Sequence, residues 1–214
     1  QLSKIYENLA KNHVGLLITG NFGVCASGIM GNLYDLENDK IINELPKLVR
    51  VCFNHNTKII MQLTHVGRQA FEKDLKQGPA LAPSAVFEST FGIMPKAMTK
   101  KDIEYVKKMF VRGAKIAFDS GFNGIQLHGA HGYLISQFLS PHMNKRKDEY
   151  GGNTENRTRF AVEIANQIRK ETSEDFLIGI KYNCHDYYTD GIDEEEFKSI
   201  TKRFNGIFDF VEVS

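Results

Sequence analysis

The stretch that decides the fold is residues 121–160, GFNGIQLHGAHGYLISQFLSPHMNKRKDEYGGNTENRTRF. Residues 125–127 look like the end of a buried strand, and His128, His131 and Tyr133 follow it closely. In α/β folds, functional side chains usually lie on the turn after such a strand. We therefore expect the functional site at this turn.

Strand-like and helix-like segments alternate on both sides of this stretch. Short apolar runs predict strands, and apolar residues at helical spacing predict amphipathic helices between them. The expected strands are 14–19, 58–63, 125–127, 176–182 and 208–213. The expected helices are 2–10, 41–53, 99–120, 133–138, 153–170 and 192–204. This alternation is typical of βαβ units that build a parallel sheet.

A parallel sheet of this kind belongs to a doubly wound domain or to a barrel. No GxGxxG or GxxxxGK[ST] sequence follows any of the strands, which disfavours Rossmann and P-loop domains. Gln62, His128 and Lys181 lie at strand ends, where (β/α)8 barrels carry their active residues. We therefore predict an α/β fold, a (β/α)8 TIM barrel, as one domain over residues 1–214. Since a complete barrel has eight strands, five strands predict an incomplete one.

The composition is that of a globular protein without a dominant charge. Of the 214 residues, 42% are hydrophobic, and 27 basic against 26 acidic side chains leave a net charge of +1. We therefore expect neither nucleic acid nor a membrane as a partner. Cys25, Cys52 and Cys184 are far apart and form no CxxC pair. This cysteine usage indicates a reducing compartment, so we expect the cytoplasm.

The two histidines of the HGAHG sequence are compatible with three interpretations. His128 and His131 could bind a metal, with His142 or Asp148 as a third ligand. They could instead donate two N–H hydrogen bonds to one substrate oxygen, with Tyr133 as a nearby proton source. They could also be structural histidines with satisfied hydrogen bonds. The metal interpretation lacks a third ligand at a regular offset, so we expect no metal.

A long motif in this region resembles a known family. The sequence HGAHGYLISQFLSPHMNKRKDEYGGNTENRTRF is similar to the signature of the Old Yellow Enzyme family of FMN-dependent ene-reductases. Residues 62–68 (QLTHVGR), residues 82–84 (APS) and residues 180–181 (IK) support the resemblance. The resemblance runs from the first helix to the sixth strand of the family's barrel. It implies that strand 1 and strands 7 and 8 of that barrel are absent.

The resemblance also implies roles for individual residues. It implies that His128 and His131 hold the carbonyl oxygen of the substrate above the flavin and that Tyr133 is the catalytic proton donor. Gln62 would bind the flavin pyrimidine, and Asn21 matches a position that lines the flavin. Lys181 stands where the family usually has arginine, against the flavin N1 and O2 edge.

The implied activity is an NAD(P)H-dependent reduction of activated alkenes. NADH or NADPH would reduce FMN, and an enone or another small activated alkene would accept hydride from flavin N5 and a proton from Tyr133. The sequence is also compatible with a homo-oligomer. One alternative is an inactive or non-flavin-binding fragment of such a barrel, which would bind FMN weakly or not at all. A metal-dependent hydrolase that uses His128 and His131 is a second, less favoured alternative.

Overall fold

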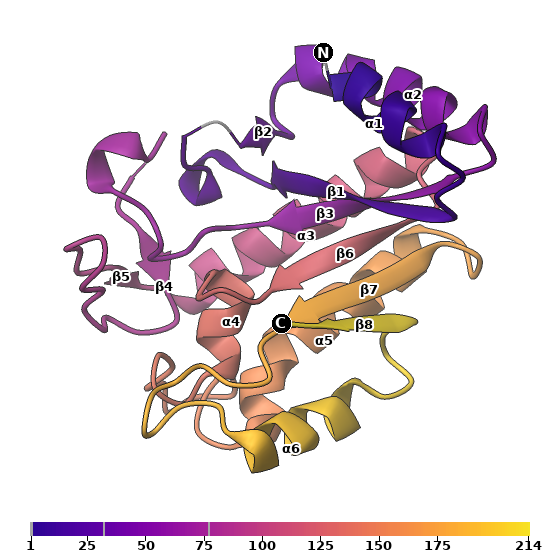
Figure 1. The fold of residues 1–214 in the computed structure, drawn as a ribbon. Coiled ribbons are helices and arrows are strands. Elements are labelled where there is room, and N and C mark those ends of the chain that lie inside the picture. Colours follow the sequence, from indigo (N-terminus) through magenta and orange to yellow (C-terminus); the bar gives the residue numbers. More distant parts are fainter. Residues whose placement is uncertain (1, 32, 77) are drawn as a thin grey trace.

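The computed structural model describes residues 2–31, 33–76 and 78–214. Within these ranges six strands form one parallel sheet, in the order β2-β1-β3-β6-β7-β8 (Figure 1). The strands are β1 (Leu16–Gly23), β2 (Tyr34–Asp35), β3 (Lys58–Thr64), β6 (Gly124–Gly129), β7 (Leu177–Tyr182) and β8 (Phe210–Val213). A separate parallel pair, β4 (Leu81–Ala82) and β5 (Lys96–Ala97), lies in the long connection that follows β3.

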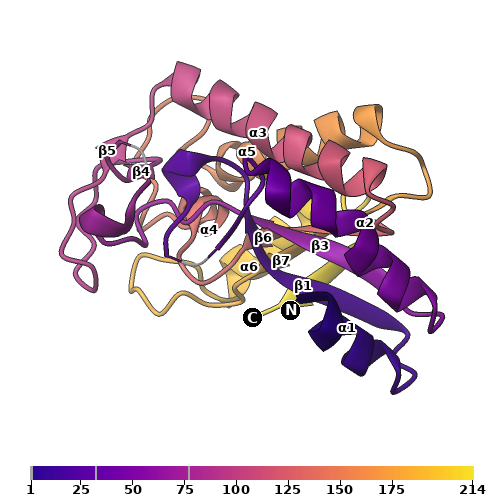
Figure 2. The same ribbon diagram turned by 90° about the horizontal axis from the view of Figure 1, so that it is seen from above.

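Helices connect the strands and pack on one side of the sheet. They are α1 (Leu2–Ala10), α2 (Asp39–Phe53), α3 (Lys100–Asp119), α4 (Leu134–Leu139), α5 (Thr154–Glu171) and α6 (Glu194–Phe204). In Figure 1 the strands lie in front of α3 and α5, with α2 above the sheet and α6 below it. The view from above, in Figure 2, also places α3 and α5 together on one side of the strands. No helix in the described ranges is long and apolar enough to cross a membrane.

The two faces of the sheet differ in chemistry because successive side chains of a strand point to opposite faces. One face packs on the helices and contributes apolar side chains to the core: Met61, Leu63, Ile125, Leu127, Ile178 and Ile180. On the other face, the register aligns Asn21 with Gln62 and Gln62 with Gln126. Two residues further along the strands, it aligns His128 with Lys181 and Lys181 with Glu212. The second face therefore carries a row of polar groups.

Local sequence signals fix where the longest helices begin. The Thr99 side chain accepts a hydrogen bond from the Asp102 backbone N–H, and the Asp102 carboxylate accepts one from the Thr99 backbone, which is a capping box. Asn153 caps α5 by accepting from the Asn156 N–H at 2.9 Å. These caps therefore set the first residues of α3 and α5.

The five predicted long strands and the predicted helices are all present, with ends that shift by a few residues. The sequence prediction missed β2, β4 and β5. Each of these strands has two residues, which is too short for a periodic pattern.

Candidate active site

The end of β6 and the turn after it bring together the two predicted substrate-binding histidines and the predicted proton donor. His128 lies near the carboxyl end of β6, and Tyr133 immediately precedes α4. His131, between them, has a left-handed backbone with φ = 58°, and Gly132 follows with φ = 72°. The His131 N–H donates to the Asn183 side-chain oxygen at 3.0 Å. This bond ties the turn to the residue after β7 and supports a backbone conformation that is uncommon for a side chain with a Cβ atom.

The rings of the three residues are close neighbours. The centroids of the His128 and His131 rings are 5.0 Å apart with an interplanar angle of 74°. The His128 and Tyr133 ring centroids are 4.7 Å apart. The Ala130 N–H donates to His128 Nδ1 at 3.3 Å, so Nδ1 is an acceptor and the proton of the neutral ring lies on Nε2. The turn thus fixes His128 as an Nε2–H donor.

Burial keeps these groups in their neutral forms near pH 7. It lowers the pKa of His128 to about 3, and the nearby His131 and Lys181 charges act in the same direction. Burial and the Lys181 charge also lower the pKa of His131. Burial raises the pKa of Tyr133 above its ordinary value. The cluster therefore offers two neutral imidazoles and a protonated phenol, which are hydrogen-bond donors and a weak acid.

The predicted cofactor residues lie on the polar face of the same sheet. Lys181 on β7 lies opposite His128 on β6 in the strand register. The Lys181 Nζ lies 2.8 Å from Glu212 Oε1. Gln62 Nε2 donates to Gln126 Oε1 at 2.5 Å, and Gln126 Nε2 donates to Glu212 Oε2 at 2.9 Å. Asn21 is half-buried on β1 beside Gln62. The structure therefore places all three predicted cofactor residues on one face.

This donor set fits a flavin pyrimidine, the cofactor edge that the resemblance implies. That edge alternates N–H and C=O groups. In the part of the chain that the structure describes, Gln62 Oε1 has no hydrogen-bond partner. Gln62 can therefore accept from a ring N–H, while the Lys181 ammonium can donate to a ring oxygen or nitrogen.

Sequence reasoning missed several residues that hold this site. Gln126 and Glu212 connect Gln62 to Lys181. The Ser214 hydroxyl lies 2.7 Å from His131 Nε2. Gln126 could have been found, because a residue two positions before His128 on a strand shares its face. Glu212 and Ser214 carried no such signal, since only the strand order brings β8 to this place.

The proposed third metal ligands are engaged elsewhere. His142 Nδ1 lies 2.6 Å from an Asp190 carboxylate oxygen, and Asp148 pairs with Arg146 at 2.6 Å. Among the residues that the structure describes, no three His, Cys, Asp or Glu side chains gather in a metal-binding arrangement. The interpretation of His128 and His131 as metal ligands therefore gains no support.

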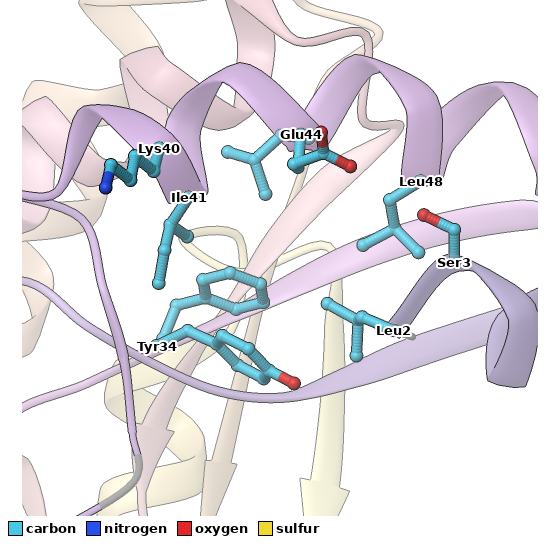
Figure 3. A pocket seen from close by; sticks show the side chains of 9 residues that line it. Leu2, Ser3, Tyr34, Lys40, Ile41, Glu44 and Leu48 are labelled. Atoms are coloured by element: carbon cyan, nitrogen blue, oxygen red, sulfur yellow. The ribbon is translucent and has the colours of Figure 1, made fainter.

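Two cavities of about 370 Å³ lie near the sheet. The first adjoins the candidate site and is lined by His131 and Gly132, together with Gln69, Met143, residues 183–188 and Ser214. The second is lined by residues of α1, α2, β1 and β2, mainly by apolar side chains, among them Leu2, Ile41 and Leu48 (Figure 3). Of these two cavities, only the first has a predicted site residue, His131, in its wall, and His128 and Tyr133 do not line it.

Comparisons with known proteins agree with these observations. A family profile described as the NADH:flavin oxidoreductase / NADH oxidase family matches residues 2–208. An NADPH dehydrogenase of Geobacillus sp. (strain WCH70) is 38% identical over 212 residues, which are 98% of this chain and 60% of that protein. An NADH oxidase of Thermoanaerobacter brockii is 36% identical over 94% of this chain and 31% of its own length. The chain thus spans less than two thirds of the length of each of these relatives.

Solved structures give the same fold. An Old Yellow Enzyme from Pichia sp. AKU4542 superposes with a TM-score of 0.87 at 29% identity, over 99% of this chain and 61% of that chain. A histamine dehydrogenase from Rhizobium sp. 4-9 superposes with a TM-score of 0.91 at 24% identity, over 100% of this chain and 32% of that one. The predicted fold, part of a (β/α)8 barrel, is confirmed, and so is the predicted resemblance. The chain belongs to the NADH:flavin oxidoreductase / NADH oxidase family, the family of flavin enzymes to which the Old Yellow Enzymes belong.

Proposed function

We propose that residues 1–214 form a single partial TIM-barrel domain that carries the active site of an NAD(P)H-dependent ene-reductase. The proposed reaction is the reduction of the activated C=C bond of a small α,β-unsaturated carbonyl compound. The observation that carries the proposal is the cluster of His128, His131 and Tyr133 at the end of β6. FMN, when bound and reduced by NADH or NADPH, supplies the hydride.

The chain's own residues would position the substrate and handle its proton. His128, held as an Nε2–H donor by the Ala130 backbone, donates to the carbonyl oxygen of the substrate, and His131 provides the second donor. Each good donor to an oxygen that gains negative charge is worth about 3 kcal/mol of barrier lowering. Tyr133 is protonated near pH 7, because the ordinary pKa of a tyrosine is about 10 and burial raises it further, and it delivers a proton to the α-carbon.

Gln62, Lys181 and Asn21 are the proposed cofactor-binding residues. Gln62 accepts and donates at the pyrimidine edge, and the Lys181 ammonium provides positive charge near that edge. Lysine lacks the planar fork of arginine, so it acts as a point charge. We also place the protein in the cytoplasm, because Cys25 and Cys52 are free thiols inside the core.

The test separates reduction of the flavin by NADPH from reduction of the alkene. The purified chain is titrated with FMN and then assayed for NADPH consumption with 2-cyclohexenone. Tyr133→Phe should slow alkene reduction by at least about 100-fold and change flavin reduction by NADPH only slightly. Tyr105→Phe, at an exposed tyrosine of α3, is the matched control and should leave both rates unchanged. Equal slowing of both steps in Tyr133→Phe would contradict the role of the phenol as proton donor.

The same titration decides between the enzyme and a non-flavin-binding fragment. Saturable FMN binding by this chain, seen as a shifted flavin absorbance spectrum, supports the ene-reductase. A free-flavin spectrum at every protein concentration would favour the fragment.

A further inference from the structure

Four polar side chains from four different strands form a continuous chain of contacts across the sheet. Gln62 on β3 donates through Nε2 to Gln126 Oε1 on β6 at 2.5 Å. Gln126 donates through Nε2 to Glu212 Oε2 on β8 at 2.9 Å. The other carboxylate oxygen of Glu212 lies 2.8 Å from Lys181 Nζ on β7. Glu212 is therefore the residue at which the two predicted cofactor groups, Gln62 and Lys181, are joined.

The charge of Glu212 determines which group donates and which accepts in each of these hydrogen bonds. Burial raises the pKa of its carboxyl, but the contacts with Lys181 and Gln126 outweigh this and hold the pKa below its ordinary value. An ionised carboxylate can only accept hydrogen bonds. Gln126 must therefore turn its NH2 group toward Glu212 and its oxygen toward Gln62. Gln62 must in turn donate to Gln126, which leaves Gln62 Oε1 free for a ligand.

The burial of the middle residue makes this orientation strict. Gln126 is fully buried, and Gln62 is 8% exposed. A buried amide that flips would bring like groups face to face and lose its hydrogen bonds, which is costly away from water. The orientation of Gln62 is consequently set by a charge on β8, three strands away in the sheet.

We propose that Glu212 is a positioning residue of the flavin site: through Gln126 it aims Gln62 Oε1 at a pyrimidine N–H, and through its ion pair it holds Lys181 and partly offsets the Lys181 charge. This inference rests on the proposed FMN site. In this proposal Glu212 determines which groups donate and which accept hydrogen bonds at the flavin site, although Glu212 does not itself bind the substrate or the cofactor.

The first experiment uses the chain without flavin. Side-chain NH2 resonances of Gln62 and Gln126 are followed by ¹⁵N NMR in the wild type, in Glu212→Gln and in Glu194→Gln, a matched change at an exposed glutamate of α6. Because glutamine can both donate and accept, Glu212→Gln should shift or split both amide signals. Glu194→Gln should leave them in place. Unchanged Gln62 and Gln126 signals in a folded Glu212→Gln protein would overturn the proposal.

The second experiment measures FMN binding by quenching of flavin fluorescence. Loss of one correctly aimed hydrogen bond should weaken binding about five- to tenfold, in both Glu212→Gln and Gln126→Met. Gln126→Met keeps the Lys181–Glu212 pair and removes only the amide relay. Glu212→Gln alone should raise the flavin reduction potential, since it removes a negative charge beside Lys181. Wild-type affinity and potential in both variants would overturn the proposal.

The two experiments separate failure of this inference from failure of the proposed function. If the wild-type chain binds no FMN, the proposed function of this chain fails, and the NMR result still decides whether Glu212 orients the two amides. If FMN binds and the Gln62 and Gln126 amide signals do not change in Glu212→Gln, the proposed function stands and the positioning role of Glu212 is wrong.

Discussion

His65, the histidine of the QLTHVGR segment, allows a test of how burial of an ionisable side chain affects the stability of the protein. It is 1% exposed, and its Nδ1 accepts a hydrogen bond from the Gly67 N–H at 3.0 Å. Its ring packs so closely on Gly28 that a Cβ atom there would lie 2.3 Å from the ring. Burial lowers the pKa of His65 to about 3. The folded protein therefore keeps this imidazole neutral at mildly acidic pH.

The effect on stability follows from proton linkage. In the unfolded chain the histidine has an ordinary pKa of about 6.5, so between pH 6.5 and 3 the unfolded state binds more protons than the folded state. Stability must then fall as the pH falls through this window. Between pH 7 and pH 5 one such histidine costs about 2 kcal/mol. The value is insensitive to the folded pKa as long as it stays below about 4. His128, with a pKa also lowered to about 3, contributes a similar loss.

The perturbation is His65→Asn, whose side-chain oxygen can replace Nδ1 as the acceptor for Gly67. Urea unfolding is measured for both proteins at pH 7 and pH 5. The wild type should lose about 2 kcal/mol more than His65→Asn between the two pH values. His13→Asn, at an exposed histidine with a left-handed backbone, is the matched control and should retain the wild-type loss. An equal loss in wild type and His65→Asn would refute the argument from burial.

Two further substitutions test packing and a buried ion pair, both by urea unfolding. Gly179→Ala should destabilise the protein by about 1–3 kcal/mol, because its Cβ would lie 2.1 Å from the Phe210 ring on β8. Gly20→Ala on β1, where a Cβ would have no atom within 4 Å, is the control and should not destabilise it. Equal effects of the two substitutions would contradict the packing argument. Glu88→Gln should cost about 3–5 kcal/mol, because it leaves Arg68 unpaired where both side chains are at most 3% exposed. A cost no larger than that of the exposed change Glu44→Gln would refute the second expectation.

Local sequence signals accounted for the elements that position the site. The Thr99 to Asp102 capping box and the Asn153 cap begin α3 and α5, and apolar runs located the long strands. The grouping of His128, His131 and Tyr133 was predictable for the same reason, because all three lie within six consecutive residues.

Contacts between distant segments could not be predicted in this way. The approach of Ser214 to His131 joins residues 83 positions apart, and the pairing of Lys181 with Glu212 depends on the register between β7 and β8. Register follows from how whole strands and helices pack, which no short motif encodes. The sequence placed Lys181 at a strand end, but it contained no sign that a carboxylate would hold the ammonium there.

The polar row on the sheet argues for a ligand on that face. A strand buried in a parallel sheet usually reads as a continuous apolar run, yet β3, β6 and β7 carry Gln62, Gln126 and Lys181 on one face. Each of these side chains makes a hydrogen bond or an ion pair with a side chain of another strand, so the row is tolerated. Packing does not require it, because apolar side chains of similar volume would avoid the cost of desolvation. A row that is costly to bury and leaves Gln62 Oε1 open is explained by the flavin edge that we propose lies against it.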